Sequence, residues 1–253
     1  MNVLEIHNVT QEFGGLRALE KVDVTVDLGE VFGLIGPNGA GKTTLFNLIT
    51  GIYVPTRGDI FFKHQRINGM APHTIASLGI GRTFQNIRLF KKQSVLDNVK
   101  VGMHGITHQG LWPSILQMPG ARKEEQEINE RAIDLLNMVG LADKAEEYAD
   151  NLAYGEQRRL EIARALGINP SLLLLDEPAA GMNATEKDEL MQLIRDIRSM
   201  GITILLVEHD MNLVMNICSQ VAVLDYGRKI ADGPPEMVKG DERVIASYLG
   251  VGV

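Results

Sequence analysis

Gly36-Pro37-Asn38-Gly39-Ala40-Gly41-Lys42-Thr43 fits the pattern G-x-x-x-x-G-K-[ST], which is typical of loops that bind a polyphosphate. Glycines let successive backbone N–H groups close around the phosphates, and the N-terminus of a following helix adds positive potential. In such a loop Lys42 supplies charge to the β- and γ-phosphates, and the Thr43 hydroxyl binds Mg²⁺. The apolar run 31–35 predicts a buried strand before the loop, and residues 44–50 predict a helix after it. A merely glycine-rich turn is the weaker interpretation.

Two carboxylates, Asp176 and Glu177, follow a run of four leucines at 172–175. The run predicts a buried strand, and ligands of open α/β sheets bind where strands end. We therefore expect Asp176 to bind Mg²⁺ and Glu177 to orient or deprotonate an attacking water. Carboxylates in this position can also cap a helix, but beside a phosphate loop they favour hydrolysis of a nucleoside triphosphate.

The chain changes its pattern twice along its length. Alternation of Val22, Val24, Val26 and Leu28 with polar residues predicts a half-buried strand in the first third, and residues 58–63 predict another. Residues 85–151 are mainly helical in pattern, with one apolar stripe at 128, 132, 135, 136 and 139. The last third alternates strand and helix, with expected strands 171–176, 202–207 and 221–224 and expected helices 186–199 and 211–217. The fold class is α/β, with a mainly parallel sheet, an N-terminal antiparallel β part and an inserted α-helical subdomain.

Composition excludes several classes of protein. The 253 residues carry a net charge of −7, which argues against a general nucleic-acid binder. The single cysteine, Cys218, cannot form an internal disulfide and fits a reducing compartment. No apolar run approaches the about 18–20 residues that span a bilayer, and residues 1–9 lack the basic start of a signal peptide. Secreted, disordered and integral-membrane classes are therefore not expected.

Six motifs stand in the order found in one family. They are the phosphate loop, Gln85 within 82–86, Leu152-Ala153-Tyr154-Gly155-Glu156-Gln157, the strand and carboxylates 172–177, Ala180-Gly181-Met182-Asn183, and His209 within 207–210. In these the chain resembles the ATP-binding-cassette (ABC) ATPases over essentially its whole length. The resemblance implies a single cassette, 1–253, with a RecA-like phosphate-loop core of 1–84 and 155–253 and a helical subdomain of 85–154. It also implies a head-to-tail dimer, in which each ATP lies between one subunit's phosphate loop and the other's signature segment.

The resemblance assigns roles to individual residues, with ATP and Mg²⁺ as cofactors. The catalytic residues would be Glu177, His209 and Lys42, and the Mg²⁺ ligands Thr43, Gln85 and Asp176. Nucleotide would be bound by Phe13 stacking on adenine, by Gly36, Pro37, Asn38, Gly39, Ala40, Gly41, Lys42, Thr43 and Thr44, and by Gln85. The partner's ATP would be contacted in trans by Ala153, Tyr154, Gly155 and Glu156. Ordinary core packing remains the alternative for Phe13.

The signature segment departs from the family pattern Leu-Ser-Gly-Gly-Gln. Ala153 replaces the serine that would donate a hydrogen bond to the partner's ATP, Tyr154 replaces a glycine, and Glu156 precedes Gln157. Loss of one hydrogen bond to a charged group costs roughly 1.5–3 kcal/mol, so we expect a weaker closed dimer. Asn183 stands where many members carry aspartate, so the charge that would contribute to communication across the dimer is missing at this position.

Three segments, 79–90, 154–164 and 177–183, are similar to the ATPase subunits of branched-chain amino acid importers, and among these to the first, larger one. A short helix expected near 241–249 also fits that group. The resemblance implies a motor subunit at the cytoplasmic face of the cell membrane, peripherally bound. Its partners would be two integral-membrane permeases, a second ABC ATPase and, indirectly, a substrate-binding protein, with no nucleic acid. Two alternatives remain: the ATPase of a lipopolysaccharide-export system, and a soluble ABC protein without a transport role.

An apolar docking surface for the permeases is expected at Leu89, Phe90 and the loop 102–120 with Leu111 and Trp112. The competing interpretations of these residues are the core of the insertion and an ordinary surface loop.

Overall fold

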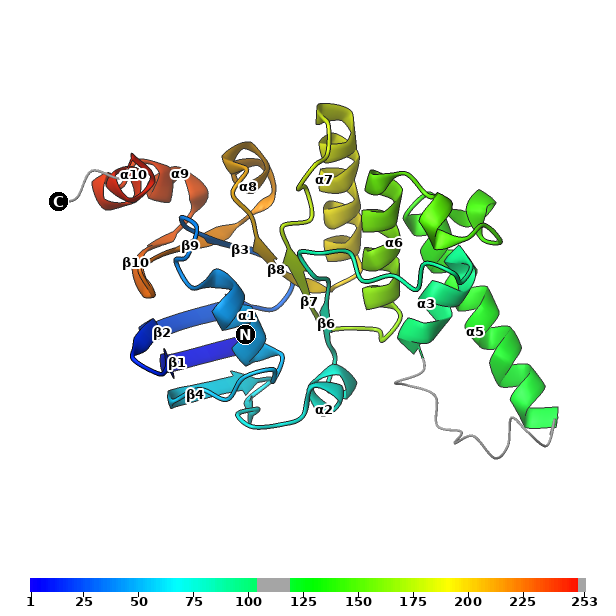
Figure 1. Ribbon diagram of the computed structural model, residues 1–253, viewed down its shortest axis with the longest axis horizontal. Helices are drawn as coiled ribbons and strands as arrows, with labels where there is room; N and C mark the ends of the chain where they lie inside the picture. The colour runs from blue at the N-terminus through cyan, green and yellow to red at the C-terminus, as the bar shows by residue number, and fades with distance from the viewer. Residues whose placement is uncertain (104–118, 250–253) are drawn as a thin grey trace.

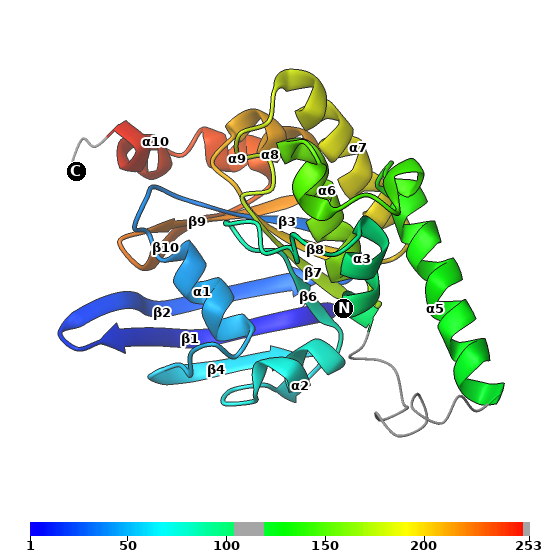
Figure 2. The ribbon, with the colours of Figure 1, turned by 45° about the vertical axis from the view of Figure 1, so that its right-hand side comes forward.

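The computed structural model describes residues 1–103 and 119–249 (Figure 1). These residues form a four-stranded sheet of order β2-β1-β4-β5 and a six-stranded sheet of order β10-β9-β3-β8-β7-β6. Helix α1 (Lys42–Ile49) packs between the two sheets, and the helices α6, α7 and α8 lie on the other side of the larger sheet (Figure 2). The predicted α/β class is therefore confirmed.

The smaller sheet is antiparallel and comes from the first quarter of the chain. It contains β1 (Asn2–Phe13), β2 (Leu16–Asp27), β4 (Arg57–Phe62) and β5 (Gln65–Arg66). The predicted alternation holds for Val22, Val24 and Val26, which are all buried. It fails for Leu28, because β2 ends at Asp27 and Leu28 lies in the following turn with 53% of its surface exposed.

The larger sheet is parallel except at its edge strand β10 (Arg228–Gly233). Its central strand β3 (Val31–Ile35) lies between β8 (Thr203–Val207) and β9 (Gln220–Asp225), and β7 (Leu172–Asp176) and β6 (Ile80–Arg82) follow on the β8 side. Alternate residues of the central strands enter the two apolar cores: Leu172 and Leu174 pack towards α1, whereas Leu173 and Leu175 pack towards the helices. Burial of both faces is what the unbroken apolar runs predict.

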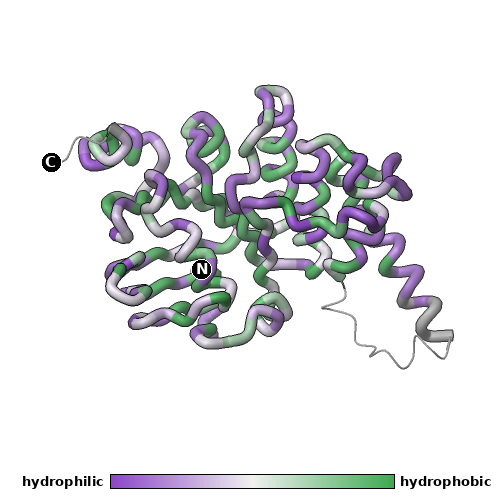
Figure 3. The backbone as a smooth tube through the Cα atoms, viewed as in Figure 1, coloured by the Kyte–Doolittle hydropathy of each residue, from purple (hydrophilic) through white to green (hydrophobic). Residues whose placement is uncertain are grey.

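The middle of the chain is helical, as predicted. It forms α3 (Val95–Met103), α5 (Pro119–Met138), two short 3-10 turns (Ala142–Lys144 and Ala149–Asn151) and α6 (Tyr154–Leu166). The expected apolar stripe is buried at Ala132, Leu135 and Leu136 of α5 and at Val139 directly after it, while much of α5 is hydrophilic (Figure 3). One apolar cluster runs from α3, α5 and α6 into β7 and β8, so the division at 84/85 and 154/155 stays a prediction.

The C-terminal part adds α7 (Ala184–Ser199), α8 (Met211–Ile217), α9 (Pro235–Lys239) and α10 (Glu242–Leu249), and α2 (Pro72–Ser77) lies beside β6. Helices α7, α8 and α10 agree with the predicted ranges to within two residues. In residues 1–103 and 119–249, no helix is both long enough and apolar enough to cross a membrane.

Candidate active site

The phosphate loop connects β3 to α1 and passes close to two other strands. A Cβ atom on Gly36 would lie 2.0 Å from the Leu224 carbonyl oxygen of β9, and one on Gly41 would lie 2.7 Å from a methyl group of Leu19 in β2. Both glycines also have positive φ, 147° and 105°. Only glycine therefore allows the loop to follow this path, and helix α1 begins directly after it at Lys42.

Lys42 is buried at the mouth of this loop. Its Nζ donates to the carbonyl oxygens of Gly36 at 2.6 Å and Pro37 at 3.0 Å. Burial lowers the pKa of the Lys42 ammonium, and the carboxylates of Glu177 and Asp176 oppose that shift. The charge is thus held by the loop itself and lies within reach of the acidic strand end.

A pocket of about 620 Å³ opens over the loop, which is within the usual range of small-molecule sites. Its lining includes the predicted residues Phe13, Asn38, Gly39, Ala40, Gly41, Lys42, Thr43, Thr44, Gln85 and Glu177. It also includes Leu16, Arg17, Ala18 and Tyr226, which the sequence analysis did not single out. Residues from β1, β2, the phosphate loop and the β9–β10 turn therefore meet around one cavity with Glu177, which directly follows β7.

Two aromatic residues mark the rim of the pocket. Phe13 is 39% exposed rather than a core residue, and its ring packs edge-on against Tyr53 with the centroids 5.1 Å apart. Tyr226 is 90% exposed and stands in a left-handed conformation, with φ of 42°. Both rings are accessible to a ligand, and the binding role of Phe13 stays a prediction.

Asp176 ends β7 with only 2% of its surface exposed. Its Oδ2 accepts a hydrogen bond from Arg82 at 3.2 Å, whereas its buried Oδ1 has no hydrogen-bond partner among the described residues. Burial raises the pKa of the Asp176 carboxyl, and the Arg82 guanidinium opposes this shift. Arg82 lies in the same sequence segment as Gln85, but no motif marked it as a partner of Asp176.

The unpartnered oxygen of Asp176 fits a magnesium ion that is bound together with phosphates. Mg²⁺ usually takes one or two carboxylates and completes its shell with phosphate oxygens and waters. Thr43 and Gln85 line the pocket together with Glu177, the residue that follows Asp176. Within the described parts of the chain, no group of three or more His, Cys, Asp or Glu residues could hold a metal without such a ligand.

Three of the predicted residues, Glu177, Gln85 and His209, lie close together. Glu177 Oε2 accepts a hydrogen bond from Gln85 Nε2 at 3.0 Å and lies 3.8 Å from His209 Nδ1. The backbone of Glu177 has a φ of 48°, an uncommon conformation that is concentrated at functional sites, and its N–H donates to the Val207 carbonyl. The carboxylate is thereby fixed at the ends of β7 and β8, facing the pocket.

Glu208 fixes the backbone beside Glu177 and His209, and it was not identified from the sequence. Its buried carboxylate accepts backbone N–H groups from Ala179 at 2.8 Å and from His209 at 3.1 Å. Burial raises the pKa of this carboxyl, while the N–H donors oppose the shift. An acidic residue that directly follows an apolar strand was the signal available in the sequence.

The signature residues 153–156 lie at the N-terminus of α6 and are not among the described residues that line the pocket. The Glu156 carboxylate accepts from the Ala153 N–H at 3.0 Å and from Lys144 Nζ at 2.6 Å. The Lys144 ammonium lowers the pKa of Glu156. The Glu156 carboxylate is therefore bound by groups of its own chain.

Asn183 forms the N-cap of α7. Its Oδ1 accepts from the Glu186 N–H at 3.0 Å, and Glu186 Oε2 accepts from the Asn183 N–H at 2.8 Å. An aspartate would make the same cap, so the local structure of this loop does not depend on a charge at position 183.

Comparisons with known proteins agree with this geometry. The family model described as ABC transporter matches residues 19–180, and the one described as branched-chain amino acid ATP-binding cassette transporter matches residues 228–253. The chain is 44% identical to the high-affinity branched-chain amino acid transport ATP-binding protein LivG of Escherichia coli K12 and 45% identical to BraF of Pseudomonas aeruginosa, in each case over 98% of both chains. It is 34% identical to the lipopolysaccharide export system ATP-binding protein LptB of Acidithiobacillus ferridurans, over 98% of this chain and 97% of LptB.

Solved structures give the same result. The chain is similar to the ADP conformation of MJ1267, an ATP-binding cassette of an ABC transporter, with a TM-score of 0.87, 31% identity and 99% of both chains covered. It is also similar to a dimeric, post-hydrolysis state of the cassette MJ0796 bound to ADP and phosphate, with a TM-score of 0.78 and 26% identity over 92% of this chain and 98% of that one.

Proposed function

The chain belongs to the ABC transporter family, and from this premise we propose that it is the ATP-hydrolysing subunit of a membrane importer for branched-chain amino acids. The observation that carries the substrate class is the similarity to LivG and BraF, which extends over 98% of the chain. The match of residues 228–253 to a branched-chain amino acid transporter model supports the same class. LptB is a more distant relative, at 34% identity.

ATP occupies the pocket over the phosphate loop. Adenine stacks on the exposed ring of Phe13, and the phosphates lie against the backbone N–H groups of residues 38–44. Lys42 exchanges its bonds to the Gly36 and Pro37 carbonyls for bonds to the β- and γ-phosphates. Thr43, Gln85 and Asp176 would hold Mg²⁺, which neutralises phosphate charge when bound.

Hydrolysis uses the corner formed by Glu177, Gln85 and His209. The Glu177 carboxylate takes a proton from water, the water oxygen forms a bond to the γ-phosphorus, and the bond from that phosphorus to the leaving ADP oxygen breaks. Gln85 holds the Glu177 carboxylate in place, and His209 is close enough to contact the γ-phosphate once it is bound.

A second cassette completes the site. Residues 153–156 stand apart from the pocket of their own chain, and the N-terminus of the 13-residue helix α6 offers N–H groups suited to an anion. A head-to-tail dimer brings these groups onto the partner's ATP. The second cassette is a different ATPase or another copy of this chain.

The permeases dock in a groove of about 390 Å³ between the core and the helical segment. Its apolar lining includes Ile52, Phe84, Phe90 and Val101. Phe90 is 48% exposed, and its backbone is fixed by hydrogen bonds in both directions with the buried side chain of Asn98. Leu89 packs against the main core instead, which favours Phe90 as the docking residue. Leu111 and Trp112 lie outside the described residues. Each cassette of the dimer thereby binds one of the two permeases at the cytoplasmic face of the membrane.

Purification of the tagged protein from its own cells in mild detergent tests the assignment. We expect two polytopic permeases and a second cassette ATPase to copurify, and the reconstituted complex to import leucine, isoleucine or valine in the presence of ATP. The Glu177→Gln complex serves as the inactive control. A lipid-export membrane partner would replace the assignment by the lipopolysaccharide system, and ribosomes or nucleic acid would contradict a transport role.

A further inference from the structure

Tyr154 stands where the family pattern has a glycine, and its side chain makes contacts that a glycine could not. Its ring lies directly over Gly181, where an added Cβ would be 3.0 Å from a ring carbon of Tyr154. Its hydroxyl accepts a hydrogen bond from Arg158 Nη2 at 2.9 Å. The residue therefore connects the start of α6 to the segment 180–183 on one side and to Arg158 on the other.

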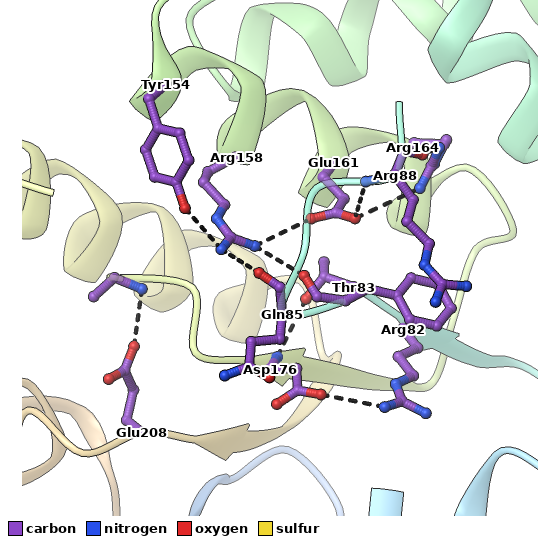
Figure 4. Close-up of polar contacts among 12 residues, drawn as sticks. Arg82, Thr83, Gln85, Arg88, Tyr154, Arg158, Glu161, Arg164, Asp176 and Glu208 are labelled. Carbon is purple, nitrogen blue, oxygen red and sulfur yellow. Dashed lines mark hydrogen bonds and ion pairs between the residues drawn. The ribbon is translucent and has the colours of Figure 1, made fainter. Parts of the chain in front are cut away.

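Arg158 binds the segment that carries Gln85. Its side chain is only 4% exposed. Nη1 donates to the Phe84 carbonyl at 2.8 Å, and Nη2 donates to the Gln85 carbonyl at 2.5 Å as well as to Tyr154 (Figure 4). A guanidinium presents these donors in one rigid plane, so its three acceptors are held in a fixed relation to one another.

Two further side chains of α6 secure the same segment one turn later. Glu161 Oε1 accepts from the Arg88 N–H at 3.3 Å, and Arg164 donates to the Arg88 carbonyl. Glu161 is buried between the two arginines, 3.5 Å from Arg158 and 3.7 Å from Arg164. The backbone of residues 84–88 is thus bound to α6 and must move with it.

The side chain of Gln85 continues the connection to the chemistry. Its Nε2 donates to Glu177 Oε2, the expected general base, at 3.0 Å. A continuous series of contacts therefore runs from Gly181 through Tyr154, Arg158 and Gln85 to Glu177. The series begins in the segment 180–183, passes through the signature segment at Tyr154 and ends in the pocket of the same chain.

We propose that Tyr154 and Arg158 are positioning residues that transmit the presence of ATP at the partner's site to Gln85 and Glu177 of their own protomer. The inference rests on the proposed function, in which residues 153–156 contact the partner's ATP. Nucleotide at the signature segment fixes Tyr154, Tyr154 fixes Arg158, and Arg158 places the Gln85 backbone so that Glu177 meets the water. The two ATP sites of the dimer consequently hydrolyse cooperatively.

Tyr154→Phe tests the connection with little risk to folding, because the ring over Gly181 is kept and one hydrogen bond is removed. ATP hydrolysis by the purified transporter is measured against ATP concentration. We expect a Hill coefficient above one in the wild type, a value near one in the variant, and a fall in kcat of about fivefold, the size of one modest hydrogen bond. ATP affinity of the isolated subunit should stay unchanged. Wild-type cooperativity in Tyr154→Phe, or a wild type without cooperativity, would overturn the proposal.

A double-mutant cycle with Gln85→Ala separates positioning from a general structural effect. If Tyr154 acts through Gln85, adding Tyr154→Phe to Gln85→Ala costs no further activity, whereas independent effects multiply and refute the connection. Arg159→Gln is the matched control, because Arg159 is the next residue on α6 but pairs with the exposed Glu189 at 2.6 Å. It should leave hydrolysis and cooperativity unchanged. If the effects of the two substitutions multiply while the transporter still imports its substrate, this inference alone is refuted. If the wild-type transporter does not hydrolyse ATP, the proposed function is refuted.

Discussion

Glu177 occupies a strained backbone position with its carboxylate between Gln85 and His209, an arrangement that suits a base which must point in one direction. Glu177→Gln keeps the shape and the neighbouring contacts but cannot accept a proton. We expect ATP to bind normally and turnover to fall about 10²- to 10⁴-fold, measured as phosphate release beside nucleotide affinity. Glu236→Gln, an exposed change on α9, is the control, and wild-type turnover in Glu177→Gln would remove the base assignment.

Ala153 is the N-cap of α6, and its extended backbone already has the conformation that a capping serine adopts. In Ala153→Ser, the hydroxyl accepts the Glu156 N–H and can donate to the partner's γ-phosphate. We expect the free energy of unfolding to rise by about 1 kcal/mol, with a tighter ATP-bound dimer or faster hydrolysis. Thermal unfolding and sedimentation of the dimer measure the two effects. If Ala153→Ser changes neither dimerisation nor the kinetics of ATP hydrolysis, the absence of a serine at this position has no effect on function.

Those residues of the site that lie within a short sequence motif could be predicted from the sequence. The glycines and Lys42 follow from the geometry of a phosphate loop, and Asp176 and Glu177 follow from their place at the end of an apolar strand. Tyr226 could not be found in this way, because only the pairing of β9 beside β3 brings its turn to the pocket. The contact of Arg82 with Asp176 likewise depends on the pairing of β6 with β7.

At the scale of an element, Asn183 determines how α7 begins. Asn183→Ala removes the side-chain acceptor of the Glu186 N–H, and we expect it to lower the free energy of unfolding by about 1 kcal/mol. Asn183→Asp keeps the acceptor and should stay within about 0.5 kcal/mol of the wild type, since the cap is preserved. Denaturant unfolding of both variants measures the difference. Equal loss in both would mean that the cap is not the source of the effect.

Glu208, which directly follows β8, makes the stability of the fold depend on pH. Burial raises the pKa of Glu208 above its ordinary value of 4.5, so near that pH the folded chain keeps a proton that the unfolded chain has released. The contribution of Glu208 to stability is therefore largest at low pH and is lost as pH rises through the raised pKa. Relative to Glu208→Gln, whose side chain does not titrate, the wild type should lose stability over that interval. If the unfolding free energy of the wild type, measured relative to Glu208→Gln, stays constant or increases with pH, the predicted direction is wrong.

Elements with a clear hydrophobic period were predicted, and short elements without one were missed. Strands β3, β7 and β8 are unbroken apolar runs, and α7 has four apolar residues on one face. Helices α2 and α9 contain six and five residues and begin at Pro72 and Pro235, so they are too short to show a period. Strand β10 has no buried alternation because it is the edge of its sheet.

At the scale of the whole molecule, a substitution at Phe90 tests whether transport can be lost while ATP binding is kept. Phe90→Asp places a charge in the apolar groove, so we expect import to fall at least tenfold because burying an unpaired charge in a docked interface is costly, while ATP affinity is kept. Uptake by reconstituted vesicles and nucleotide binding are the measurements. Leu28→Asp, at an equally exposed leucine in the turn after β2, is the control. Normal import by Phe90→Asp would exclude the groove as the docking surface.

The place of β3 in the sheet has a consequence for biosynthesis. Among the described residues, the strand that precedes the phosphate loop pairs with β8 and β9, which come from residues 203–225. During translation the apolar segment Val31–Ile35 emerges early and has no strand partner until the last quarter of the chain has left the ribosome. Non-local pairing of this kind delays folding and leaves apolar surface open to aggregation. We therefore expect the ATP site to stay incomplete during synthesis until residues 203–225 have been made and can pair with β3.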